Sequence, residues 1–169
     1  KAAFHSTTER EAEMKQLAHW MGFADQNLIS TTFEIETVGD LISEQGLLCG
    51  GVFTLMEWTL EAMIRAGVPP ELAREECMTE LALVAGLIQS KGAAEAFSAI
   101  STAAKAGTLE MRKRFNDSNF GAHFEKQTQD VLNGAFADRF FQSHRSGELR
   151  KQSNAFSTRL QKLQEGKRE

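Results

Sequence analysis

Apolar and polar residues repeat with the 3.6-residue period of an α-helix along almost the whole chain. The pattern predicts helices over residues 7–21, 36–66, 70–90, 93–106, 123–133, 135–145 and 148–165. Residues 6–9 read Ser-Thr-Thr-Glu, which is typical of a capping box at the start of the first helix. Residues 23–35 form a connector, of which residues 28–33 have some strand character. Because no segment of any length alternates between apolar and polar residues, we expect an all-α fold.

Glycines interrupt the longest predicted helix at Gly46, Gly50 and Gly51. Each costs up to about 1 kcal/mol relative to alanine, so each needs a reason. A close approach of another helix or a ligand is one reason, and a local kink is the other. The sequence alone does not choose between them.

Two pairs of carboxylates stand out in the predicted helices: Asp40 with Glu44, and Glu76 with Glu80. Each pair is spaced i, i+4, so both side chains leave the same helix face. Both pairs border apolar stripes that we expect to pack inward. The stripe beside the second pair consists of Leu72, Ala73, Leu83, Val84 and Leu87. Like charges in an apolar setting need compensation, and a bound Mg²⁺ ion, which prefers oxygen ligands, would supply it. The alternative is that the carboxylates form a solvated acidic helix face.

Composition limits the class of protein. A chain of 169 residues with 41% hydrophobic residues can form a domain with a core, and a net charge of −4 gives no reason to expect nucleic-acid binding. No apolar run reaches the ~18–20 residues of a membrane span, because Glu57 and Glu61 interrupt the longest candidate, so we expect no membrane partner.

Cysteine and histidine usage excludes further classes. Cys49 and Cys77 both lie in helical patterns, which indicates buried thiols, and they do not make a disulfide framework. We therefore expect a reducing, cytoplasmic compartment. The cysteine usage is also compatible with an organelle such as a plastid or mitochondrion. The histidines show no metal-binding spacing, and residues 46–51 are no dinucleotide fingerprint, because no strand precedes them.

Several blocks of residues resemble one known family. Residues 32–45 read TFEIETVGDLISEQ and are soon followed by LCGG at residues 48–51. They resemble the metal-binding segment of ketol-acid reductoisomerase (acetohydroxyacid isomeroreductase), T-F-x-x-E-T-x-x-D-L-x-x-E-Q and then L-C-G-G. Residues 76–81, ECMTEL, match the family's E-C-x-x-E-L, and Ser101 falls where the family keeps a substrate-binding serine. The resemblance covers residues 15–107 well and implies an all-α, dimer-forming and metal-binding domain.

The resemblance also implies roles for particular residues. The implied ligands of two Mg²⁺ ions per site are Asp40, Glu44, Glu76 and Glu80, the first two from one subunit and the last two from its partner. Of these, Asp40, Glu44 and Glu80 would be catalytic. The implied substrate-binding residues are Leu48, Cys49, Ile100 and Ser101.

The implied reaction converts 2-acetolactate to 2,3-dihydroxyisovalerate in branched-chain amino-acid biosynthesis, on the path to valine and isoleucine. Magnesium would polarise the carbonyl group while an alkyl group migrates, and NADPH would reduce the product of that migration. The partners implied are thus a 2-acetolactate-like substrate and a second copy of the chain, in a homodimer or higher homo-oligomer.

The chain departs from the family pattern in two respects. After Ser101 the family continues D-T-A-E-Y-G, whereas residues 102–107 read TAAKAG, which leaves the substrate open. The dinucleotide-binding half is also missing, so no residue here is expected to bind NADPH.

The expected organisation follows from that second departure. Residues 1–30 are interpreted as a helix and connector from the missing N-terminal domain, and residues 31–169 as the helical domain. Such a chain would be inactive by itself as an NADP-dependent enzyme. The alternatives are the dimerisation domain of a related NAD(P)-dependent oxidoreductase with another substrate, and a non-catalytic helical interaction module.

Overall fold

The computed structural model describes residues 2–4 and 10–167, and almost all of this part is helical, which confirms the all-α expectation. The α-helices are α1 (Glu11–Trp20), α2 (Phe33–Ser43), α3 (Gly50–Arg65), α4 (Pro70–Arg74), α5 (Glu80–Lys91), α6 (Ala93–Ala99), α7 (Thr102–Asp117), α8 (Gly121–Leu132), α9 (Ala135–Ser146) and α10 (Glu148–Gln164). Two π-helical turns and one 3₁₀ turn accompany them: η3 (Glu44–Leu48), η4 (Glu75–Thr79) and η2 (Asp25–Asn27).

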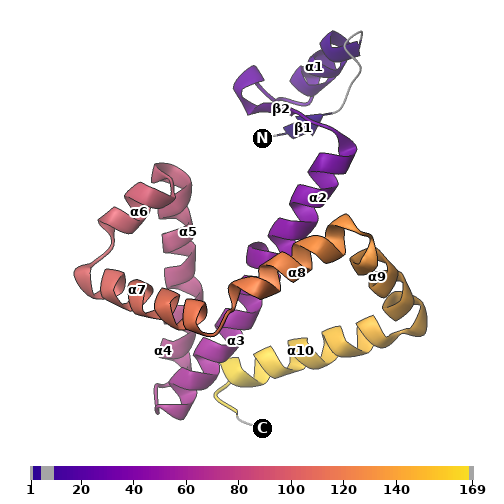
Figure 1. Ribbon diagram of the computed structural model, residues 1–169. Helices are drawn as coiled ribbons and strands as arrows, with labels where there is room; N and C mark the ends of the chain where they lie inside the picture. Colours follow the sequence, from indigo (N-terminus) through magenta and orange to yellow (C-terminus); the bar gives the residue numbers. More distant parts are fainter. Residues whose placement is uncertain (1, 5–9, 168–169) are drawn as a thin grey trace.

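The N-terminal residues form a small unit at the top of Figure 1. Strand β1 (Ala2–Phe4) pairs in parallel with β2 (Leu28–Ser30), and α1 lies between them in the chain. The strand character of the connector is thus confirmed at residues 28–30, while β1 was missed. Helix α1 begins at Glu11, and the capping box predicted at residues 6–9 lies outside the described residues.

A long rod built from α2, η3 and α3 forms the axis of the molecule (Figure 1). The rod begins earlier than predicted, at Phe33, because the Thr32 side chain accepts a hydrogen bond from the Ile35 amide at 3.1 Å and caps the helix. It ends before Gly67, whose φ of +85° favours glycine. Pro70 then opens α4, as predicted.

Two arms extend from the rod (Figure 1). One arm consists of α4, η4, α5, α6 and α7, and the other of α8, α9 and α10. Helix α8 crosses the rod at α2 and η3, and α10 returns to pack against α3 and α4. The single short helix predicted over residues 93–106 is wrong, because α6 ends at Ala99, Ser101 caps α7, and Gly107 lies inside α7, where its Cβ position has open space.

The buried core lies where α10 returns to the rod. Leu60 and Ile64 of α3, Ala73 of α4 and Leu163 of α10 form one cluster and are at most 6% exposed. Besides these four, only Ala96 among the described apolar residues is buried. The core of a single chain is therefore small for a domain of this length.

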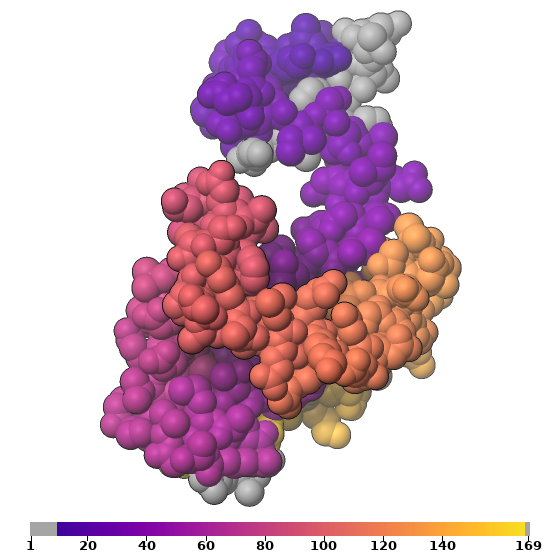
Figure 2. All heavy atoms as spheres, turned by 60° about the vertical axis from the view of Figure 1, so that its left-hand side comes forward, coloured from indigo at the N-terminus to yellow at the C-terminus, as the bar shows by residue number. Residues whose placement is uncertain are grey.

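The surface is correspondingly large. The chain exposes 12594 Å², whereas a compact monomer of 18.7 kDa would expose roughly 8300 Å². Figure 2 shows an opening through the molecule between α2, the α5–α6 tip and the N-terminal unit. Much of what is exposed is apolar, because large side chains such as Leu83 and Trp58 are more than half exposed.

The rod, Phe33–Arg65, is also long and apolar enough to cross a membrane, with a mean hydropathy of 1.4 over its best window. The expectation that no such segment exists was therefore wrong. The same test is passed by core helices of helical domains. Here only 11% of that window is buried, although Leu60 and Ile64 lie in the cluster with α4 and α10 and Glu57 and Glu61 pair with Arg159.

Candidate metal centre

The first carboxylate pair lies at the junction of α2 and η3. Asp40 is in the last turn of α2, Glu44 is the first residue of η3, and both side chains are exposed. The neighbouring Ile42 is half-buried where α8 crosses, and its carbonyl accepts a hydrogen bond of 2.9 Å from Gln127 Nε2. Helix α8 thus covers this stretch of the rod and leaves the two carboxylates accessible.

Glycines make the π-helical turn next to Glu44 possible. The Cys49 amide donates to the Glu44 carbonyl, five residues back, at 2.9 Å. A Cβ on Gly50 would lie 2.0 Å from the Gln45 carbonyl oxygen, and one on Gly51 would lie 2.4 Å from the Gly46 oxygen. Any side chain at these positions would therefore collide with the backbone. Single π-helical turns inside α-helices are frequent at functional sites.

Glycine is required at position 46 for a different reason. A Cβ there would lie 3.2 Å from the ring of Phe124 on α8, so the glycine permits a close approach of that helix. Both explanations that the sequence left open therefore apply, each at a different glycine.

The second carboxylate pair lies at the other π-helical turn. Glu76 is inside η4, Glu80 opens α5, and the Glu80 amide donates to the Glu75 carbonyl five residues back. Both side chains are exposed. The expectation that they border an inward-packing stripe is confirmed at Ala73, which is buried in the core cluster, and wrong at Leu83 and Val84, which are 61% and 43% exposed. The described chain therefore covers this stripe only at its α4 end.

The two pairs do not meet within one chain. Among residues 2–4 and 10–167, no group of three or more His, Cys, Asp or Glu residues lies close enough to hold a metal ion. Among the described residues, the two carboxylate pairs therefore stand apart from each other. Their donor chemistry fits magnesium, because Mg²⁺ prefers oxygen ligands, keeps several waters and needs only one or two carboxylates from a given element.

The cysteines differ from each other. Cys49 is exposed, so the prediction of a buried thiol is wrong there, because its side chain lies on a face of the rod that the described chain leaves uncovered. Cys77 is half-buried, with its Sγ 3.7 Å from the Sδ of Met63. Burial, and then the charge of Glu76, raise the pKa of the Cys77 thiol, which makes it a poor nucleophile at neutral pH.

Ser101 lies at the junction of α6 and α7, on the same arm as Glu76 and Glu80. It caps α7, since its Oγ accepts a hydrogen bond of 3.2 Å from the Ala104 amide, and its hydroxyl is exposed. Lys105, in the block that departs from the family pattern, donates from Nζ to the Ser98 carbonyl at 2.7 Å. Of the other predicted substrate-binding residues, Leu48 is exposed in η3, on the rod, and Ile100 is half-buried just before Ser101.

Sequence reasoning missed a groove where α8 meets the rod. It has a volume of about 360 Å³ and a wall of aromatic side chains that includes Trp58, Phe120 and Phe124. Gln45 also lines it, and the Gln45 Nε2 is buried without a hydrogen-bond partner. A helical period cannot reveal this groove, because it brings together residues far apart in the chain.

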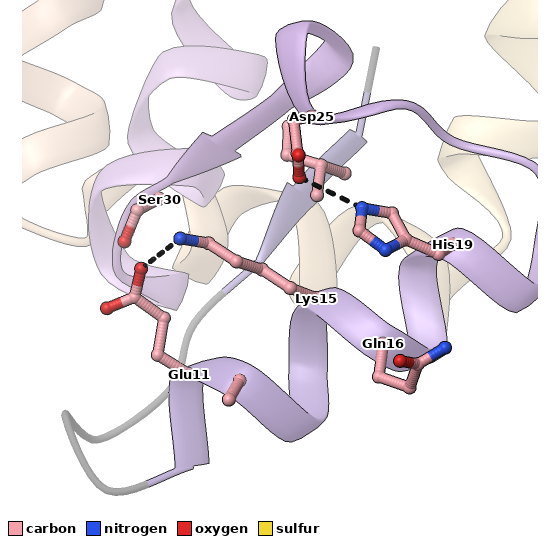
Figure 3. Close-up of a pocket in the computed structure, with 8 residues that line it drawn as sticks. Glu11, Lys15, Gln16, His19, Asp25 and Ser30 are labelled. Carbon is pink, nitrogen blue, oxygen red and sulfur yellow. Dashed lines mark hydrogen bonds and ion pairs between the residues drawn. The ribbon is translucent and has the colours of Figure 1, made fainter.

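A second hollow, of about 510 Å³, lies in the N-terminal unit between α1 and β2 (Figure 3). Lys15 Nζ pairs with Glu11 at 2.6 Å, and His19 Nε2 with Asp25 at 2.9 Å, as the dashed lines in Figure 3 show. The bond to Glu11 raises the pKa of Lys15 above its ordinary value. This hollow shares no residue with the carboxylate pairs.

Comparison with known proteins decides the family. Residues 33–167 match the family model described as "Ketol-acid reductoisomerase, C-terminal domain". The chain belongs to the ketol-acid reductoisomerase family. The matched range contains both carboxylate pairs and Ser101.

A solved structure agrees with this membership. The chain is similar to the structure of an NADH-preferring ketol-acid reductoisomerase from an uncultured archean, with a TM-score of 0.74 and 27% sequence identity. The similarity covers 90% of this chain but only 45% of that protein. The present chain thus spans less than half the length of that protein.

Proposed function

We propose that this chain is the magnesium- and substrate-binding part of a ketol-acid reductoisomerase that converts 2-acetolactate to 2,3-dihydroxyisovalerate. One observation carries the proposal: each of the two carboxylate pairs that match the family's motifs stands exposed at its own π-helical turn. Such turns cost helix stability and are frequent at functional sites. A merely solvated acidic face would need neither of them.

The candidate residues have different roles in this proposal. Asp40 and Glu44 from one copy and Glu76 and Glu80 from another would hold magnesium, which would supply Lewis acidity toward the substrate. The Ser101 hydroxyl has accepting capacity and a proton left after capping α7, so it orients the substrate by hydrogen bonding. Leu48, Cys49 and Ile100 flank these groups in sequence and line the substrate pocket.

A second copy of the chain completes the site. The chain exposes roughly 4300 Å² more than a compact monomer of its mass would, and obligate dimer interfaces bury about 2000–5000 Å² or more. A two-fold axis would bring the first pair of each copy to the second pair of the other and so build two equal sites. We therefore propose a homodimer as the smallest competent unit.

Hydride transfer needs a nicotinamide cofactor, bound by a dinucleotide-binding part outside this chain. The N-terminal unit supports this division, because β1, α1 and β2 form a strand–helix–strand unit with parallel strands, the building block of parallel sheets. We assign residues 1–30 to the end of that part. NADPH is the cofactor that the family resemblance implies, and the choice between NADPH and NADH rests with the dinucleotide-binding part.

A calorimetric titration with Mg²⁺ tests the proposal. The wild-type chain should bind Mg²⁺ saturably, and both Glu44→Gln and Glu80→Gln should lose this binding. In a random 1:1 mixture of the two variants, half of the dimers are mixed and each has one intact site, so about a quarter of the wild-type capacity should return.

The mixture separates a shared site from its alternatives. If both half-sites belonged to one chain, mixing would restore nothing. Equal weak binding by the wild type and both variants would mean a solvated acidic face, and would refute the proposed metal site.

A further inference from the structure

A lysine side chain joins the two helices that meet at Ser101, α6 and α7 (Figure 1). Lys105 of α7 donates from Nζ to the carbonyl oxygen of Ser98 in α6 at 2.7 Å. Within residues 93–117, all of which the structure describes, this is the only hydrogen bond between the two helices. Lys105 stands where the family pattern D-T-A-E-Y-G has glutamate, so the bond is a feature of this chain rather than of that pattern.

The carbonyl that accepts this bond is one that α6 cannot satisfy by itself. Ser98 lies in the last turn of α6, which ends at Ala99, and the last carbonyls of a helix have no amide partner within it. A lysine can satisfy such a carbonyl and is attracted by the partial negative charge of the helix C-terminus. Lys105 thus closes the end of α6, while the Ser101 Oγ caps the start of α7.

Lys105 is also held differently from most lysines of this chain. Among the described lysines, only Lys15 and Lys105 are half-buried, and the others are exposed. Lys15 pairs with a carboxylate on its own helix, whereas Lys105 bonds to the backbone of another helix. Because an ordered lysine side chain loses up to about 2 kcal/mol of conformational entropy, a contact must compensate for the ordering. The bond to Ser98 is the contact that the structure shows.

The corner between α6 and α7 has little else to fix it. Ile100 and Ser101 are extended, with ψ of 163° and 157°, and no backbone hydrogen bond of the described chain crosses them. Helix α6 packs against α5, whereas no residue of α7 is buried. The ring stack of Phe115 on Phe120, at 4.8 Å between centroids, holds only the far end of α7. The start of α7 therefore depends on Lys105 for its position relative to α6.

We propose that Lys105 is a positioning residue for substrate binding: by fixing the start of α7 to the end of α6, it holds the Ser101 hydroxyl where that hydroxyl meets the substrate. The inference rests on the substrate-binding role proposed for Ser101 above. Because the Ser101 Oγ accepts from the Ala104 amide, the first turn of α7 sets the direction of the proton that is left for the substrate. Hydroxyl hydrogen bonds form over about 2.5–3.0 Å, so a small displacement of this turn weakens the bond to the substrate.

A double-mutant cycle tests whether Lys105 acts through Ser101. The full chain, saturated with Mg²⁺, is titrated calorimetrically with 2-acetolactate as wild type, Lys105→Met, Ser101→Ala and the double variant. Methionine keeps the unbranched apolar stem of lysine and removes the charged donor. Lys105→Met should weaken binding by roughly fivefold or more in the wild type but by less than about twofold in Ser101→Ala, because residues that act through each other are not additive. The affinity for Mg²⁺ should be the same in all four proteins.

Further variants control this comparison. Lys113→Met removes the same charge from an exposed position on the same helix and should bind 2-acetolactate like the wild type. Lys105→Arg keeps a long charged donor and should recover most of the affinity. Hydrogen exchange at the amides of residues 104 and 105, both bonded to Ser101, should be faster in Lys105→Met than in Lys113→Met. Lys105→Gln replaces the methionine variant if circular dichroism shows that Lys105→Met loses helix.

The outcomes separate this inference from the proposed function. If removing Lys105 costs the same factor with and without Ser101, Lys105 does not act through Ser101 and the inference is overturned. If Lys105→Met binds like the wild type while Ser101→Ala binds weakly, the inference is again overturned and the proposed function stands. A wild type that does not bind 2-acetolactate, or a Ser101→Ala variant that binds it equally well, overturns the role of Ser101 and the inference together.

Discussion

Gly50→Ala tests whether the π-helical turn beside Glu44 depends on glycine. Replacing glycine by alanine inside a helix normally stabilises it by about 1 kcal/mol. At this position the new Cβ would lie 2.0 Å from the Gln45 carbonyl oxygen, 1.4 Å inside the 3.4 Å at which ordinary contact begins. The turn must therefore distort or revert to a regular α-helix.

The magnitude follows from these opposing effects. Forcing atoms into an occupied space costs about 1–3 kcal/mol, which cancels or exceeds the gain in helix propensity. Gly107→Ala in α7 is the control, because nothing lies within 4 Å of its Cβ position and it should show the gain alone. The two variants should therefore differ by roughly 1–3 kcal/mol, or roughly 2–12 °C in Tm for a chain of this size.

The functional consequence is separate from stability. Losing the extra residue of a π-helical turn rotates α3 against α2 by about 100°, the angle per residue of an α-helix. This moves Leu48 and Cys49 away from Asp40 and Glu44 and misaligns any half-site that a second copy brings. We expect Mg²⁺ affinity to fall at least about tenfold, measured by calorimetry at a temperature where circular dichroism shows intact helices. If Gly50→Ala melts higher, as Gly107→Ala should, and binds Mg²⁺ normally, then the turn does not require glycine and the argument is wrong.

Two further predictions concern a helix cap and a titrating group. Ser101→Ala should lower the free energy of unfolding by about 1 kcal/mol, because the Ala104 amide loses its acceptor, whereas Ser101→Thr should retain the cap. Ser101→Ala should also weaken substrate binding but spare Mg²⁺ binding, and equal loss of Mg²⁺ binding would refute the assigned role. Hydrogen bonds from Lys126 and Arg139 hold the pKa of Asp130 below its ordinary value, so ionised Asp130 adds stability at neutral pH that is lost as the pH falls through that lowered pKa. Urea unfolding should therefore show Asp130→Asn less stable than the wild type at pH 7, with a difference that shrinks only below about pH 4, and a constant difference down to pH 3 would contradict this.

Most helix boundaries could be predicted because their signals are local. Pro70 has no amide hydrogen and a fixed φ, so it opens α4 wherever the chain folds. The positive φ of Gly92 and Gly147 likewise marks real helix ends. Gly107 misled because glycine tolerates a helix interior as well as an end, and the break between α6 and α7 lies at Ile100 and Ser101 instead.

The candidate site was predictable in its residues but not in its geometry. The spacing of Asp40 and Glu44 fixes their common helix face. The helical period of apolar residues does not, however, distinguish a face that packs within the chain from one that a second copy covers. The stripe with Leu83 was therefore expected to be buried and is exposed. The π-helical turn η3 was also hidden, because its one-residue expansion places the Gly50 Cβ position against the Gln45 carbonyl oxygen, and sequence patterns are written for regular helices. The second turn, η4, contains no glycine that could have marked it.

The small core and the accessible carboxylates have one common explanation. A chain that buries four residues in its main cluster gains little stability alone, yet it keeps a continuous rod and two arms whose apolar faces are uncovered. If those faces meet a second copy, the dimer contact that stabilises the fold also brings Glu76 and Glu80 to Asp40 and Glu44. Folding, assembly and metal binding would then be a single linked equilibrium, in which each step stabilises the others by mass action. On this argument, a single copy lacks its metal site for the same reason that it lacks a full core.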